Sequence, residues 1–142
     1  MQKAKEARRK EALEERLSGL RPNERAGLAD FARHLLLLYG DALQRIVLFG
    51  SKARGDADSE SDLDLLIVMR MASGDYRQYR DEIVDIAWQI ESTYGVVTSL
   101  VIKDERDYAA MLRHQLLLAH NIEQDGIELW TTPPSTPTLQ PA

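Results

Sequence analysis

The sequence predicts a small α/β protein of the α+β type, in which a mixed sheet of about four strands has helices packed on it. Two observations indicate this fold class. Segments with apolar residues at helical spacing alternate along the chain with short apolar runs that are rich in β-branched residues. The 142 residues are also enough for one domain with a real hydrophobic core.

Two helical segments come before the first strand. Residues 1–17 are rich in Lys, Arg, Glu and Ala, and their leucines lie at helical spacing. A solvated helix and a contact arm for a partner are both consistent with this composition. Pro22 begins a second helix that ends before Gly40, where glycine suits a helix C-terminus. Its expected apolar stripe is Leu28, Phe31, Leu35 and Leu38.

The remaining elements follow from the same periodicities. Residues 46–49 form a short apolar strand, and a second strand carries Asp62 and Asp64 before it continues to Met69. Apolar residues then step by three and four from residue 76 to residue 94, which predicts an amphipathic helix. Residues 96–102 form a β-branched strand, and a short closing strand covers residues 127–130. Between them, a single helix is expected with the apolar face Tyr108, Met111, Leu112, Leu116, Ala119 and Ile122.

These elements divide the chain into three parts. We expect a charged N-terminal helical arm over residues 1–22 and one folded domain over residues 23–130. Residues 131–142 contain four prolines, which predicts a disordered tail.

Composition excludes several classes of function. The chain has no cysteine, which excludes disulfides, thiolate metal sites and thiol catalysis. It has no apolar run long enough to span a bilayer and no signal-peptide pattern, so we expect a cytoplasmic protein without a membrane partner. The net charge of −5 argues against a large non-specific nucleic-acid surface.

The strongest functional signal is a pair of carboxylates. Side chains alternate along a strand, so Asp62 and Asp64 project from the same face. Two like charges held side by side are unfavourable unless a cation lies between them. An ordinary polar hairpin with solvated acids is the alternative, but it does not explain two aspartates within an apolar strand.

The turn before this strand completes the pattern. Gly50 lets the backbone turn and approach a ligand closely, and Ser51 begins a short helical turn that reaches Arg54. Backbone N–H groups at such a turn favour anions, while Ser51 and Arg54 add a hydroxyl donor and a fixed cation. A phosphate cradle beside paired oxygen ligands predicts a magnesium–nucleotide site.

The string LFGSKARGDADSESDLDLLIV, from residue 48 to residue 68, resembles the minimal nucleotidyltransferases, a branch of the superfamily that includes DNA polymerase β. This resemblance implies the nucleotidyltransferase fold. It also implies that Gly50, Ser51 and Arg54 bind the nucleotide phosphates of ATP. Asp62 and Asp64 are then the catalytic pair that binds Mg²⁺ or Mn²⁺, and a nucleoside monophosphate is moved onto an acceptor hydroxyl.

The same resemblance suggests a partner. Many minimal nucleotidyltransferases resemble antitoxins that are encoded beside a HEPN-type toxin and adenylylate one of its tyrosines. A protein partner of this kind or a homo-oligomer is therefore expected, although a small molecule or an RNA end presented by a partner also fits the acceptor. No further domain that could grip a template duplex is visible in the sequence.

One part of the family pattern is missing. Active members usually place a third carboxylate on a neighbouring strand, and residues 96–102 contain no acid. Thr98 or Ser99 lies at the vacant position, while Asp85 or Asp104 could substitute only if the fold brings one of them close. The alternative function is therefore a catalytically weakened nucleotide-binding subunit, an antitoxin that acts by forming a complex.

Other residues that often carry chemistry show no functional spacing. His34, His114 and His120 have no metal-ligand pattern, so a structural role is expected for each. Trp88 and Trp130 fit core or rim positions, and one of them could also flank a nucleotide base.

Overall fold

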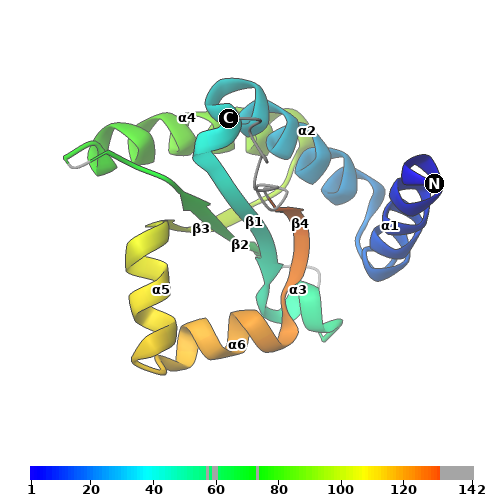
Figure 1. Cartoon of the computed structure of the whole chain (residues 1–142). Coiled ribbons are helices and arrows are strands. Elements are labelled where there is room, and N and C mark those ends of the chain that lie inside the picture. The colour runs from blue at the N-terminus through cyan, green and yellow to red at the C-terminus, as the bar shows by residue number, and fades with distance from the viewer. Residues whose placement is uncertain (57, 59–60, 73, 132–142) are drawn as a thin grey trace, which may run out of the picture.

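The computed structural model describes residues 1–56, 58, 61–72 and 74–131, and it places a four-stranded sheet between two helical layers (Figure 1). The strands are β1 (Leu43–Phe49), β2 (Leu63–Met69), β3 (Thr98–Asp104) and β4 (Ile127–Thr131). Their spatial order is β3-β2-β1-β4. β2 and β3 are parallel, whereas β1 is antiparallel to both β2 and β4. The predicted mixed sheet is confirmed.

Two helices cover one face of the sheet. They are α2 (Pro22–Tyr39) and α4 (Tyr76–Tyr94), which lie together on the same side in Figure 1. The larger core cluster joins their apolar residues to every second residue of β2, namely Leu63, Leu65 and Ile67. Both helices have the expected bounds, and α2 ends at Gly40. Leu38 was wrongly assigned to the buried stripe of α2, because its side chain is 55% exposed.

The opposite face carries α5 (Glu105–Arg113) and α6 (Leu117–Asp125). A smaller core cluster joins Tyr108 and Ile122 from these helices to the alternate residues of β2, Leu66 and Val68. The alternation of β2 thus assigns each of its side chains to one layer or the other.

The prediction of a single helix over this region is wrong, because the helical structure is interrupted between α5 and α6. Gln115 has a left-handed φ of 54°. The N–H of Gln115 bonds to the carbonyl of Leu112, and the N–H of Leu116 bonds to the carbonyl of Met111. These two bonds form a Schellman motif, which satisfies the last carbonyls of α5 and ends that helix. Leu112 and Leu116 are consequently exposed rather than part of a buried stripe.

The N-terminal end of the chain adds one helix to this core. α1 (Gln2–Arg16) carries no buried residue, but Leu17 and Leu20, which follow it, pack into the larger core cluster. The predicted disordered tail covers residues 131–142. Thr131 is the last residue of β4, and residues 132–142 lie outside the described residues. None of the helices that the structure describes has the length and apolar character needed to cross a bilayer.

Candidate active site

The candidate site lies where β1 ends and β2 and β3 begin. β1 is antiparallel to β2 and places Phe49 opposite Asp64, while β3 is parallel to β2 and places Ser99 beside Asp64. The helix α3 (Gly50–Arg54) follows β1 directly at this edge (Figure 1). Three segments that are distant in sequence therefore meet around one carboxylate.

Asp64 faces the side of the sheet that carries α5 and α6. It alternates with Leu63 and Leu65, which point into the larger core cluster. Asp62 is exposed and comes immediately before β2, so the expectation that both aspartates lie within the strand is wrong by one residue. The two remain close enough to interact. Burial and the charge of Asp62 raise the pKa of Asp64, while a hydrogen bond from the Ser99 hydroxyl and the charge of Arg54 partly oppose that rise.

Gly50 is required by the position of Asp64. Its φ of +75° lies in the left-handed region, which L side chains rarely adopt. A Cβ atom at this position would also lie 3.0 Å from the Asp64 Cγ and well inside van der Waals contact of Oδ2. The carboxylate thus occupies the space that a side chain on residue 50 would fill.

α3 is a short helix that carries the remaining predicted residues. Ser51 and Arg54 are three positions apart and therefore share one side of the helix. α3 ends at Gly55, whose φ of 83° is left-handed. The Arg54 Nε lies 3.2 Å from the Asp56 Oδ2 in an exposed ion pair, which costs little to break. Arg54 is thus available to an anionic ligand that approaches this edge.

The structure distinguishes between the candidates for the vacant third position. Ser99 shares the face of Asp64, and its hydroxyl donates to that carboxylate. Thr98 points to the opposite face, where its Oγ1 lies 3.3 Å from the Glu91 Oε1 on α4. Of the two hydroxyls, Ser99 is therefore the one at the site.

Neither Asp85 nor Asp104 reaches the site. Asp85 is exposed on α4, which packs on the other face of the sheet. Asp104 ends β3 at the far edge, where it accepts hydrogen bonds from the backbone N–H groups of Met71 and Arg106. Among the residues that the structure describes, no group of three His, Cys, Asp or Glu side chains could hold a metal ion. Any cation at this edge would therefore be held by two carboxylates, those of Asp62 and Asp64, and by oxygen atoms of a bound small molecule.

A known protein family matches the part of the chain that contains these elements. Residues 29–115 match the family model described as the nucleotidyltransferase domain. The chain belongs to this family. It is a nucleotidyltransferase, and the matched segment contains α3, both aspartates and Ser99.

The chain is also similar to individual proteins. A candidate protein adenylyltransferase of Methanocaldococcus jannaschii is 36% identical over 83 residues, which are 58% of this chain and 76% of the relative. A solved candidate minimal nucleotidyltransferase is 33% identical with a TM-score of 0.40, covering 72% of this chain and 90% of its own. A toxin–antitoxin crystal structure with AMP-PNP is 23% identical with a TM-score of 0.48, covering 72% of this chain and 73% of its own.

Two residues of the nucleotidyltransferase were not singled out from the sequence. The Lys52 Nζ on α3 lies 2.8 Å from the Glu24 Oε2 on α2, and the two side chains are only 8% and 3% exposed. Glu24 follows Pro22 at the third position of α2, a pattern that is typical of a helix start with a capping box. No spacing in the sequence links Glu24 to Lys52, because they come from separate elements.

The tryptophans lie on a helix surface and against the core, and the histidines are exposed or half-buried. Trp88 is 73% exposed on α4, and Trp130 packs against the larger core cluster. The His34 Nδ1 contacts the Asp30 carbonyl within α2, while His114 and His120 are exposed.

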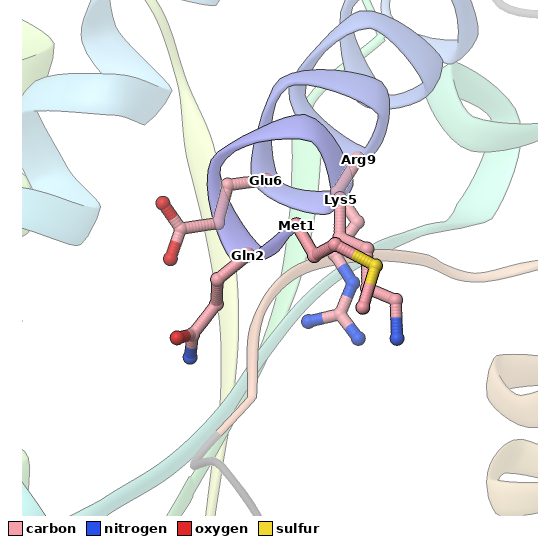
Figure 2. Close-up of a pocket in the computed structure, with 5 residues that line it drawn as sticks. All are labelled: Met1, Gln2, Lys5, Glu6 and Arg9. Atoms are coloured by element: carbon pink, nitrogen blue, oxygen red, sulfur yellow. The ribbon is translucent and has the colours of Figure 1, made fainter.

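The nucleotidyltransferase also has a hollow at the beginning of α1. Its lining residues are Met1, Gln2, Lys5, Glu6 and Arg9 (Figure 2). Met1 precedes α1 and the other four lie in its first turns; in the close-up, Gln2 and Glu6 extend to one side and Lys5 and Arg9 to the other. None of them is a predicted site residue, so this hollow is separate from the candidate site.

Proposed function

We propose that this nucleotidyltransferase is a magnesium-dependent adenylyltransferase that moves AMP from ATP onto a hydroxyl of a protein partner. The observation that carries this proposal is the close packing of Asp64 against Gly50, with Asp62 beside it, at the beginning of α3. The name of the M. jannaschii relative supports both AMP as the transferred group and protein as the acceptor.

Asp62 and Asp64 fit a divalent cation. The pKa of Asp64 is raised by burial and by Asp62, so the pair is unfavourable in the ionised form without a counter-charge. Mg²⁺ commonly takes one or two carboxylates together with phosphate oxygens, which matches the two carboxylates present. When bound, Mg²⁺ or Mn²⁺ would supply Lewis-acid polarisation of the phosphate oxygens.

Ser51 and Arg54 would bind the triphosphate. They share one side of α3, and the charge of Arg54 already acts on Asp64, so phosphates held by Arg54 would lie close to the carboxylate pair. The guanidinium offers a fixed fork of donors to phosphate oxygens, and the hydroxyl of Ser51 adds a neutral donor. We propose that these two residues and the backbone at Gly50 orient the α-phosphate toward the acceptor.

The transfer itself is a displacement at phosphorus. The acceptor hydroxyl oxygen forms a bond to the α-phosphorus of ATP, and the bond between that phosphorus and the oxygen bridging to the β-phosphate breaks. Pyrophosphate leaves with the electron pair of the broken bond. The hydroxyl proton passes to water or to a group of the acceptor protein, because the serine hydroxyl at the vacant third position is no general base near neutral pH.

The same vacancy favours a second candidate function. Ser99 stands where the third carboxylate of active members is expected, which weakens the side of the site that activates the acceptor. A nucleotide-binding antitoxin that acts by complex formation would need only Asp62, Asp64 and α3. Catalysis and complex formation are distinguished by whether a covalent product appears.

The partner that we propose is a HEPN-type toxin encoded beside this gene, with a second copy of this chain as the alternative acceptor. The support is the resemblance of residues 48–68 to antitoxin nucleotidyltransferases, together with the protein-modifying name of the relative.

The test is to incubate the protein with each of the four nucleoside triphosphates, Mg²⁺ or Mn²⁺, and the product of the neighbouring gene. Intact-protein mass spectrometry then reports any added nucleotide, and peptide mapping reports the modified hydroxyl. We expect AMP on the partner from ATP and no product with the Asp64→Asn variant. Tight ATP binding without any covalent product would favour the antitoxin that acts by complex formation.

A further inference from the structure

A buried ion pair ties the helix of the candidate site to the helical layer behind it. The Lys52 Nζ lies 2.8 Å from the Glu24 Oε2, and both side chains are almost fully removed from solvent. The other oxygen of Glu24 accepts a hydrogen bond of 2.9 Å from the backbone N–H of Arg21 at the start of α2. Although burial opposes it, these bonds hold the pKa of Glu24 below its ordinary value, so the carboxylate is ionised.

The position of Lys52 on α3 determines which way its side chain points. Successive residues of an α-helix are turned by about 100°. Ser51 and Arg54 therefore lie on one side of α3, while Lys52 lies on another side, toward α2. The lysine that follows the Gly-Ser turn thus bonds to a carboxylate within the protein, and its ammonium is not directed at a phosphate.

Besides this ion pair, α3 contacts β1, β2 and α6. It has only five residues, and a helix of that length is not stable by itself. Ala53 packs against the larger core cluster, but a methyl group supplies little contact area. Buried ion pairs generally contribute less to stability than their short distances suggest, and holding one specific arrangement is a use that is known for them.

We infer that the Glu24–Lys52 pair is a positioning device: it fixes the rotation of α3 so that Ser51 and Arg54 face the triphosphate. This inference rests on the proposed function for its ligand. Lys52 and Glu24 are thus positioning residues rather than catalytic residues, and they act only through α3.

The experiment uses three variants of the full chain. Glu24→Gln leaves the buried charge of Lys52 without its partner, and Lys52→Met leaves Glu24 with only the exposed Arg21, whose Nε lies 3.5 Å from the Glu24 Oε1. Each variant should lower Tm by roughly 10 °C. The double variant removes both charges and keeps an amide oxygen for the Arg21 N–H, so its Tm should return to within a few degrees of wild type. Arg45→Met is the control, because it breaks the ion pairs of Arg45 with Glu128 and Glu123 near the other end of β1.

Two measurements separate positioning from stability. In all three variants, hydrogen exchange at the amides of residues 50–55 should be faster than in wild type, and affinity for Mg-ATP should fall about tenfold while affinity for adenosine changes little. The double variant decides the matter, since its Tm recovers but its α3 should remain loose. Arg45→Met should lower Tm without faster exchange at residues 50–55.

The inference is overturned if the double variant binds Mg-ATP as tightly as wild type, or if affinity simply follows Tm across all the variants. A wild-type protein that does not bind ATP would instead refute the proposed function. Exchange at residues 50–55 would still decide in that case whether the ion pair fixes α3, so the two failures are distinguishable.

Discussion

Replacing Gly50 with alanine tests the close packing on which the candidate site depends. The substitution has two separate costs. An L side chain in the left-handed region costs about 1–2 kcal/mol, and the φ of Gly50 is +75°. The new Cβ also displaces the Asp64 carboxylate, which should lose its hydrogen bond with Ser99 at a further cost of about 1 kcal/mol. Gly50→Ala should therefore destabilise the protein by roughly 2–3 kcal/mol.

Gly55→Ala is the matched control for the backbone cost. Gly55 has a φ of +83°, but nothing lies within 4 Å of the position that a Cβ would take. Its substitution should cost only about 1–2 kcal/mol, or roughly 3–6 °C in Tm for a chain of this size. The additional loss at Gly50 then measures the clash with Asp64.

A double-mutant cycle isolates that clash. In an Asp64→Ala background, the carboxylate is absent, so Gly50→Ala should cost no more than Gly55→Ala does. The coupling between the two positions should be about 1 kcal/mol, measured by urea unfolding of the four proteins. A coupling near zero would show that Gly50 and Asp64 do not share this space, and the geometry of the site would be wrong.

Three other predictions concern the charges and hydroxyls of the site. The pKa of Asp64 is raised in the folded state. The free energy of unfolding of the metal-free protein, compared with that of Asp64→Asn, should therefore fall as pH rises from about 3.8 through the raised pKa. Equal pH profiles of the two proteins in urea unfolding would contradict this. The double substitution of Ser51→Ala with Arg54→Ala should weaken ATP binding far more than adenosine binding by calorimetry, since both groups are assigned to phosphate; equal losses would count against that assignment. Ser99→Asp should speed single-turnover AMP transfer with little change in ATP affinity. Thr98→Asp places its carboxylate on the opposite face and should not speed transfer. A slower Ser99→Asp enzyme would mean that the serine itself is needed.

The local patterns of the sequence were sufficient for most of the fold. α2, α4 and the sheet follow from apolar periodicity and from glycines at helix ends, because these signals depend on residues only a few positions apart. The break between α5 and α6 was missed because the residue with the left-handed φ is Gln115, where a Schellman motif usually has glycine.

The candidate site was predictable in its motif but not in its surroundings. The spacing of Gly50, Asp62 and Asp64 identified the edge at which the structure brings them together. The choice between Thr98 and Ser99 needed the register of β3 against β2, because a shift of one residue exchanges the two faces of a strand. The pairing of Lys52 with Glu24 needed the position of α3 relative to α2 in the folded chain, which no local pattern encodes.

Single-turnover transfer from ATP labelled at the α-phosphate to the partner protein tests the central claim most directly. The wild-type protein should transfer label from the α-position, and none from ATP labelled at the γ-phosphate, since AMP is the group that moves. Asp62→Asn and Asp64→Asn should each abolish transfer while the protein remains folded by circular dichroism. Transfer by both variants at the wild-type rate would contradict the account, because the carboxylate pair would then have no part in the reaction.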